Sequence, residues 1–237
     1  MTNKPTENAF DQVAQILGPS VFNHTISTLE SRLAGAPRAN AAASVADAAF
    51  TPELLAAAFD IRRRVGRLND LIHAAAISLS LEHILEDNEQ ILDRPSLAAG
   101  NDSVTQQFDL HTDRRVAEYK LSEWKGGDSQ RQRGLFSDLV HLAANMPAGK
   151  RAQLFVVGNR PTMWLRTTKA TTDWALNGAS KATIADYKAL GGTSSLPVPK
   201  FFAGLDPAVE VVNLEAVIPG LDQMLAGTWN QVEKEHS

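Results

Sequence analysis

Apolar residues recur at helical spacing in the N-terminal part of the chain, and this pattern predicts helices before any strand. Two helices are expected in 7–35, separated by a break near Gly18 and Pro19. Small residues dominate the stretch 36–50, which carries little hydrophobic pattern. We therefore interpret this stretch as a connection between the first helices and the rest of the chain.

A strong helix start follows this connection. Thr51 supplies a hydroxyl that can cap a helix, Pro52 fits the first helical position, and Glu53 is an early acid. Apolar residues at helical spacing then predict an amphipathic helix that extends, with or without a break, to about Leu92. The sequence thus places a long helical region ahead of the first strand.

The pattern then changes to short runs that mix β-branched and aromatic residues. Such runs occupy 96–99, 104–111 and 115–122, and polar turns separate them. This arrangement is typical of adjacent strands joined by tight turns.

Longer elements follow the three short runs. A helix is expected to begin at Asp128 or Ser129 and to end near residue 147. The remaining elements are a strand at 152–158, a helix at 161–177 and a strand at 209–218. The run 152–158 is almost unbroken in apolar residues, as in strands that are buried on both faces.

These elements predict an α/β fold, with a small mixed sheet flanked by helices and a helical N-terminal region. We assign 1–50 to a helical N-terminal extension and 51–237 to an α/β domain. The predicted order is helices, then three strands, then helix, strand, helix and strand.

Composition narrows the class of protein. The 237 residues are 43% hydrophobic and 21% charged, which is ordinary for a soluble globular protein. The absence of cysteine excludes disulfides, thiolate catalysis and cysteine-bound zinc. No apolar run approaches the ~18 residues of a membrane span, and the N-terminus lacks the apolar core of a signal peptide. We therefore expect a cytoplasmic protein.

The charge is unevenly distributed along the chain. The formal net charge of −4 argues against a general nucleic-acid coat, but residues 149–200 hold eight Lys and Arg against two acids. A locally basic surface of this kind can attract a polyanion. A simple scatter of charges is the alternative interpretation.

The two strands at 104–111 and 115–122 bring candidate chemistry together. Residues two apart in a strand share a face, so Glu118 and Lys120 are expected to point the same way. A hairpin centred near Asp113 places Asp109 opposite Glu118 or one pair away. Two carboxylates and an ammonium group can therefore converge.

This set of side chains suits phosphodiester hydrolysis. Two acids supply hard oxygen ligands for magnesium, and the bound metal polarises the phosphate and lowers the pKa of a bound water. Lys120 would then stabilise negative charge as it develops on the attacking oxygen and the phosphate. The competing interpretation is a half-exposed hairpin with an ordinary cross-strand ion pair.

Position matters more here than the three-residue pattern. An acid and a lysine two residues apart also occur at 123–125 and at 186–188. Residues two apart diverge by about 200° in a helix, which is the expected setting of 186–188. Only the stretch 118–120 combines a strand, an acid at hairpin distance upstream and a helix directly downstream.

With these residues in view, the segment 104–158 resembles the core of the PD-(D/E)xK nuclease superfamily, the restriction-endonuclease-like fold. Asp109 fits the lone acid of the motif, with Phe108 where the pattern often has proline, and Glu118 and Lys120 fit its second half. The order of helix, three strands, helix and strand is similar to that of the family.

The resemblance implies further site residues. Many members carry an acid on the helix before the sheet, and Glu82 is the residue we assign to this role as support for a second ion. A polar residue on the helix after the lysine often faces the site, and this position is expected at Gln130, Arg131 or Gln132.

The resemblance also implies a function. A member of this superfamily would be a Mg²⁺- or Mn²⁺-dependent deoxyribonuclease, such as a restriction-type endonuclease, that acts on DNA or RNA as a homodimer. Asp109, Glu118 and Glu82 would hold metal, Lys120 would assist catalysis, and the basic stretch 149–200 would contact the backbone. The alternative is a catalytically inactive protein that keeps the nuclease fold as a binding or interaction module.

Overall fold

A computed structural model describes residues 19–48, 51–66, 68–93, 95–97, 107–124, 128–206 and 208–225. The described residues up to Leu68 belong to one compact unit, and those from Asn69 onward belong to a second. This division falls after the helix that begins at Pro52.

The first unit is helical. It contains α2 (Pro19–Leu33), α3 (Arg38–Asp47) and α4 (Pro52–Val65). The start of α4 is confirmed, because the hydroxyl of Thr51 accepts a hydrogen bond of 3.1 Å from the backbone N–H of Leu54. The first helix expected in 7–35 falls largely on residues 1–18, which lie outside the described residues.

The prediction of a connection at 36–50 was wrong, because α3 occupies most of it. The segment lacks a clear apolar stripe but is rich in alanine, which has the highest intrinsic helix propensity. Its contacts with α2 complete a helical hairpin.

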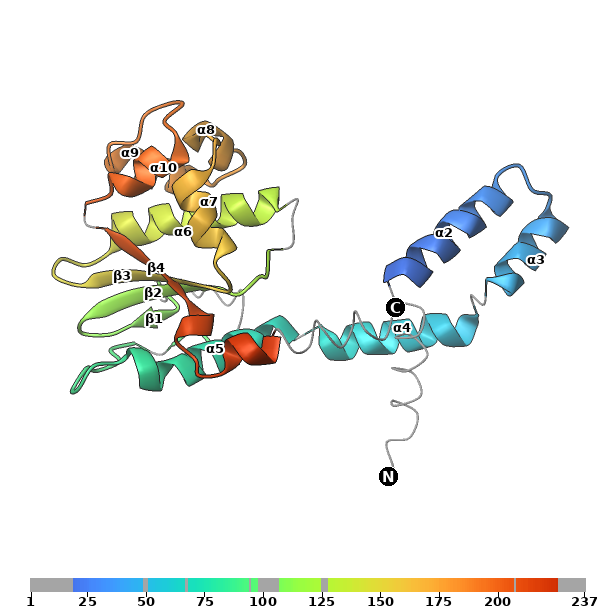
Figure 1. The fold of residues 1–237 in the computed structure, drawn as a ribbon, viewed down its shortest axis with the longest axis horizontal. Helices are drawn as coiled ribbons and strands as arrows, with labels where there is room; N and C mark the ends of the chain where they lie inside the picture. The colour runs from blue at the N-terminus through green and yellow to red at the C-terminus, as the bar shows by residue number, and fades with distance from the viewer. Residues whose placement is uncertain are drawn as a thin grey trace, which may run out of the picture. The chain divides into compact units, whose positions relative to one another are not determined.

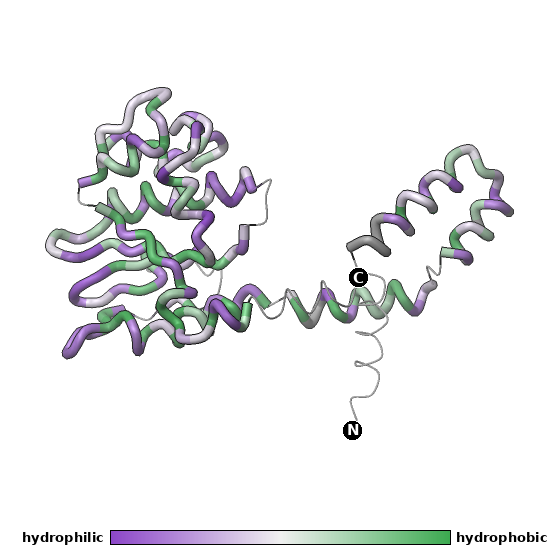
Figure 2. Tube along the Cα trace, viewed as in Figure 1, coloured by the Kyte–Doolittle hydropathy of each residue, from purple (hydrophilic) through white to green (hydrophobic). Residues whose placement is uncertain are grey.

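The first helix of the second unit is α5 (Leu68–Ile84), of which all but Leu68 belong to that unit. The long helix expected up to residue 92 is therefore two helices, and the second ends at Ile84. One side of α5 is buried through His73, Ile77 and Ser80. Its other side carries exposed apolar residues, namely Leu68, Leu71, Ile72 and Leu79. The hydropathy colouring of Figure 2 shows hydrophobic residues along α5.

A four-stranded mixed sheet forms the centre of the second unit (Figure 1). Its strands are β1 (Leu110–His111), β2 (Arg115–Lys120), β3 (Arg151–Val156) and β4 (Val209–Asn213), in the order β1-β2-β3-β4. β1 is antiparallel to β2, whereas β2, β3 and β4 are parallel. The predicted α/β class with a small mixed sheet flanked by helices is confirmed.

The first two strands are shorter than the hydrophobic pattern predicted. Residues 96 and 97 are not in a strand, and residues 98–106 lie outside the described part of the chain. Of the described residues in the strand expected at 104–111, only Leu110 and His111 form a strand, β1, because Asp109 already leaves the ladder.

Helices cover both faces of the sheet. α6 (Ser129–Asn145) packs Leu135, Phe136 and Leu139 in one core cluster with Val116 of β2. A second cluster contains Ile77 of α5 together with residues of the sheet, namely Leu110, Ala117, Tyr119 and Phe155. Since neighbouring residues of β2 belong to different clusters, α5 and α6 lie on opposite faces of the sheet.

Four helices lie between β3 and β4. They are α7 (Arg160–Thr167), α8 (Thr172–Ala175), α9 (Lys181–Ala189) and α10 (Val198–Ala203), and a 3₁₀ turn, η1 (Leu214–Ala216), follows β4. The single helix expected at 161–177 was wrong. Thr168 has extended backbone angles, and the hydroxyl of Thr171 caps a new helix by accepting from the N–H of Trp174.

In the part of the chain that the structure describes, no helix has both the length and the apolar content needed to cross a membrane.

Candidate functional site

The carboxyl ends of the three parallel strands meet at one edge of the sheet (Figure 1). Lys120 is the last residue of β2 and pairs with Val156, the last residue of β3. Ligands of open α/β sheets bind at the carboxyl ends of parallel strands, so a functional site is expected at this edge.

Asp109 lies next to this edge because of the hairpin register. Leu110 pairs with Ala117 and His111 with Val116, so Asp109 comes in line with Glu118 at the next position. Directly opposite residues of an antiparallel pair have Cα atoms about 4.5–5.5 Å apart. The hairpin thus places the backbones of the two predicted metal ligands at neighbouring positions.

The carboxylate of Asp109 ends the β1–β2 ladder. Its Oδ2 accepts a hydrogen bond of 2.8 Å from the backbone N–H of Tyr119, and the same oxygen lies 3.3 Å from Nε2 of His73. The carbonyl of Asp109 accepts from the N–H of Ser96. Only 15% of the Asp109 side chain is exposed, so the carboxylate is held firmly on the α5 side of the ladder.

Glu118 and Lys120 belong to the opposite face of the sheet. Their neighbours Ala117 and Tyr119 pack in the cluster on the α5 side, so alternation turns the two charged side chains toward α6. Nζ of Lys120 lies 2.8 Å from Oδ2 of Asp138 on α6. The lysine is 44% exposed and therefore remains accessible to a ligand.

The sequence did not identify Asp138 as a site residue. Its position in a helix after the lysine was the available signal, but several polar residues share that helix. Of the three residues considered there, Arg131 bonds to the buried carboxylate of Asp128 at the start of α6, while Gln130 is exposed and Gln132 is partly buried.

The structure does not bring Glu82 to Asp109. Glu82 is exposed on α5, nine residues after His73. Nine residues are two and a half helical turns, which place Glu82 on the opposite side of the helix and about 13 Å farther along its axis. The residue of α5 that meets Asp109 is instead His73, which the sequence did not single out.

His73 could have been found from the periodicity of α5. Together with Ile77 and Ser80 it forms the buried row at helical spacing, so a polar residue there had to lie against the sheet. Its side chain is 10% exposed. Its Nδ1 has no hydrogen-bond partner among the described residues.

Tyr119 connects this side of the site to the core. Its hydroxyl shares a 2.8 Å hydrogen bond with Ser80, and its ring stacks on Phe155 with 4.7 Å between the centroids. Burial raises the pKa of Tyr119 to about 12, although the hydrogen bond with Ser80 acts in the opposite direction. The residue whose backbone binds Asp109 is thus itself fixed in place.

The donors present fit magnesium better than zinc. Among the described residues, no group of three or more His, Cys, Asp or Glu side chains is arranged to hold a metal ion. Magnesium does not require such a cage, because it commonly keeps several waters and binds through one or two carboxylates. Asp109 and Glu118 are carboxylates of this kind, but their side chains lie on opposite faces of the sheet, so the structure does not bring the two carboxylates together.

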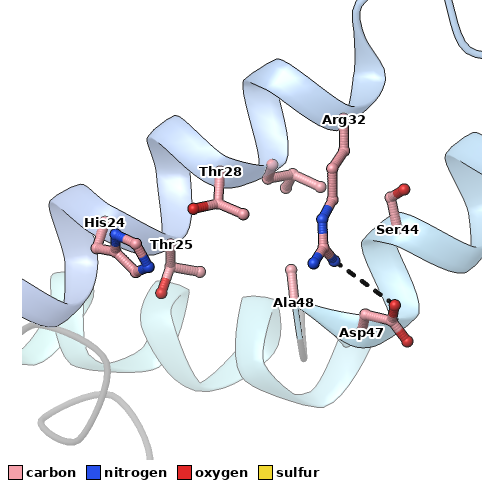
Figure 3. A pocket seen from close by; sticks show the side chains of 8 residues that line it. His24, Thr25, Thr28, Arg32, Ser44, Asp47 and Ala48 are labelled. Carbon is pink, nitrogen blue, oxygen red and sulfur yellow. Dashed lines mark ion pairs between the residues drawn. The ribbon is translucent and has the colours of Figure 1, made fainter.

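A cavity lies in the first unit, away from the predicted site residues. A pocket of about 200 Å³ opens between α2 and α3 (Figure 3). Arg32 and Asp47 form an ion pair of 3.6 Å beside it, and His24 and Thr28 also line it. It contains none of the residues that the sequence predicted for catalysis.

Comparisons with protein-family models, with curated proteins and with solved structures find no match for this chain.

Proposed function

We propose that this chain is a Mg²⁺- or Mn²⁺-dependent nuclease that hydrolyses phosphodiester bonds in DNA, with Asp109, Glu118 and Lys120 as its site. The observation that carries the proposal is the hairpin register, which aligns Asp109 with Glu118 at the carboxyl end of β2. Lys120 ends the same strand two residues later.

The order of elements supports a restriction-endonuclease-like core. A helix, α5, precedes the β1–β2 hairpin, and α6 then leads to β3, which pairs in parallel with β2. This order is similar to that of the PD-(D/E)xK superfamily, which Asp109, Glu118 and Lys120 resemble, except that the described residues hold two strands before α6 where three were expected.

Each residue has a chemical role in the proposal. Asp109 and Glu118 would hold the metal, which requires one of the two carboxylates to turn toward the other's face of the sheet, and the metal would supply polarisation of the phosphate and acidification of a water. His73 and the N–H of Tyr119 orient the carboxylate of Asp109. Lys120 stabilises negative charge on the reacting oxygens, and the ion pair with Asp138 positions the ammonium group of Lys120.

A second candidate function is a non-catalytic binding module. Two contacts favour it, because Asp109 also caps the ladder at Tyr119 and Lys120 also forms an ion pair with Asp138. Both residues would then have structural reasons to be present. Metal binding and cleavage separate the two candidates.

The test compares DNA cleavage by the wild type with that by Asp109→Asn, Glu118→Gln and Lys120→Ala in Mg²⁺ and in Mn²⁺. Each substitution is expected to lower the cleavage rate about 100-fold or more, the usual scale for losing one transition-state contact. Lys188→Ala is the matched control, because Lys188 has the same acid-Tyr-Lys setting but is exposed on α9.

Calorimetric titration with Mn²⁺ adds a readout that does not depend on turnover. Asp109→Asn and Glu118→Gln are expected to weaken Mn²⁺ binding, whereas Lys120→Ala is expected to retain it. Equal cleavage by all variants would assign the activity to a contaminant. Unchanged Mn²⁺ binding in both acid variants would favour the binding module.

A further inference from the structure

Three tryptophans from distant parts of the second unit form one aromatic cluster. The ring centroids of Trp124 and Trp164 lie 6.0 Å apart, and those of Trp164 and Trp174 lie 6.5 Å apart. The guanidinium carbon of Arg133 lies 4.8 Å from the ring centroid of Trp174. We call Trp124, Trp164, Trp174 and Arg133 the tryptophan cluster.

The cluster lies close to the proposed catalytic edge. Trp124 follows Lys120 by four residues, and its carbonyl accepts a 3.2 Å hydrogen bond from Nη1 of Arg160. Arg160 begins α7 directly after β3. The chain therefore links the end of the lysine-bearing strand to the helix that carries Trp164.

The tryptophan cluster is only partly buried. The three indoles pack against core residues, but each keeps part of its surface exposed. Trp164 lies one helical turn after exposed Arg160 on α7, and its neighbour Met163 is 59% exposed.

Several cations lie near the indoles, beside which the sequence also places the acids Glu123 and Asp173. Arg160, Arg166 and Lys169 are exposed on and just after α7. Nε of Arg133 is buried and has no hydrogen-bond partner in the described ranges of the chain. Partly exposed indole faces next to cations are the combination that binds single-stranded nucleic acid, because bases stack on the rings and phosphates meet the cations.

We propose that the tryptophan cluster, with Arg160, binds unpaired nucleotides of single-stranded DNA beside Lys120. This inference rests on the proposed nuclease function and names its substrate class as DNA with a single-stranded segment. A base stacks on Trp164 or Trp124, and Arg160 contacts a neighbouring phosphate. The strand is thereby led along the edge that carries Lys120.

Tryptophan fluorescence tests the proposal directly. The chain has four tryptophans, so a Trp229→Phe background leaves only those of the cluster. An oligothymidylate of about 12 nucleotides, titrated in EDTA, is expected to quench the emission, and a blunt duplex of equal length is expected to quench it far less. Trp164→Leu in this background should weaken binding about tenfold or more, the scale of losing one stacked base.

Two further variants identify the surface. Arg160→Gln should weaken binding several-fold, whereas Lys181→Gln, an exposed lysine of α9, should leave it unchanged. If Trp164→Leu lowers the melting temperature, Trp124→Leu replaces it as the test of binding, because Trp124 lies outside the helices. Trp124→Leu should then weaken oligothymidylate binding.

Several results would overturn the inference: quenching by the duplex as strong as by the single strand, tighter binding of an oligouridylate, or Trp124→Leu binding like its background. The titration in EDTA separates this inference from the proposed function, because it measures binding without cleavage and gives its result whether or not the wild type cleaves DNA with Mg²⁺.

Discussion

At the amino end of β2, the guanidinium of Arg115 is buried against the carboxylate of Glu89. Their side chains are 3% and 0% exposed, and two hydrogen bonds of 2.5 and 2.6 Å join them. Gln153 and Thr112 complete the network by bonding to Arg115 and to Glu89. This network fixes the end of the hairpin that lies away from Lys120.

Removal of the negative charge from this pair should be costly. Glu89→Gln leaves buried Arg115 with only the 3.8 Å contact to Glu86 as a counter-charge, so the free energy of unfolding should fall by about 3 kcal/mol. Urea unfolding measures the change. Asp87→Asn, an exposed acid two residues earlier, should change stability by less than about 0.5 kcal/mol. Equal effects of the two substitutions would contradict a structural role for Glu89.

The same pair predicts an acid-dependent loss of stability. Burial acts to raise the pKa of Glu89, but hydrogen bonds from Arg115 and Thr112 outweigh it and lower the pKa from 4.5 to about 2. Its contribution is present above pH 4.5 and is lost as the pH falls toward 2. Unfolding free energies over this range should show a steeper fall for the wild type than for Glu89→Gln.

The buried hydroxyl of Tyr119 leads us to expect a loss of stability at alkaline pH. Burial raises its pKa to about 12, so the folded chain holds this proton when an unfolded tyrosine, with a pKa of 10, has lost it. Stability from this residue is therefore complete below pH 10 and is lost as the pH rises to about 12. Absorbance at 295 nm should show a late phase that Tyr119→Phe removes. A single early phase in the wild type would refute the prediction.

At the scale of elements, hydrophobic pattern predicted the parts that bury apolar faces. β3 and α6 were anticipated because the run 152–158 is continuously apolar and because α6 buries residues such as Leu135 and Leu139 at helical spacing. The site residues on β2 followed from strand alternation. Tertiary contacts decided the rest: β1 is short because Asp109 bonds to Tyr119 through its side chain instead of continuing the ladder.

Some helices have no hydrophobic periodicity from which they could be predicted. α3 has alanine in place of an apolar stripe, and α10 has only six residues. The ion pair of Lys120 with Asp138 and the contact of Asp109 with His73 join elements across the fold. Such contacts depend on how α5 and α6 pack on the sheet, which spacing along the chain does not define.

Substitutions at two glycines test how the helices of the second unit pack. A methyl group at Gly134 in α6 would meet no atom within 4 Å outside the helix backbone and its neighbours, so Gly134→Ala should stabilise the fold by about 0.5–1 kcal/mol. A methyl group at Gly192 would lie 2.3 Å from Cζ of buried Tyr187, so Gly192→Ala should destabilise it by about 1–3 kcal/mol. Thermal unfolding of both variants measures the difference, and shifts of the same sign would contradict this packing.

At the scale of the whole molecule, α5 is apolar on both its buried and its exposed sides. A helix that is apolar all round is normally covered on every side. Leu68, Leu71, Ile72 and Leu79 are 43–65% exposed. The homodimer implied by the nuclease resemblance would cover this side with a second copy of the chain.

Light scattering after size exclusion tests this assembly. The wild type should have about twice the chain mass of 25.6 kDa, and Ile72→Lys should shift it toward the monomer. Ile184→Lys is the matched control, because Ile184 is a single exposed isoleucine on α9. A monomeric wild type at micromolar concentration would reject the homodimer.

The backbone bonds that position Asp109 also protect the chain from aggregation. β1 forms the outer side of the sheet at the hairpin, where an open strand would offer unpaired backbone groups to another molecule. Here the N–H groups of Leu92 and Ser96 bond to the carbonyls of His111 and Asp109, and the N–H of Asp113 bonds to Gln90. The edge beside the candidate site is therefore already occupied, so this protein should not add strands there to form fibrils or open-ended polymers.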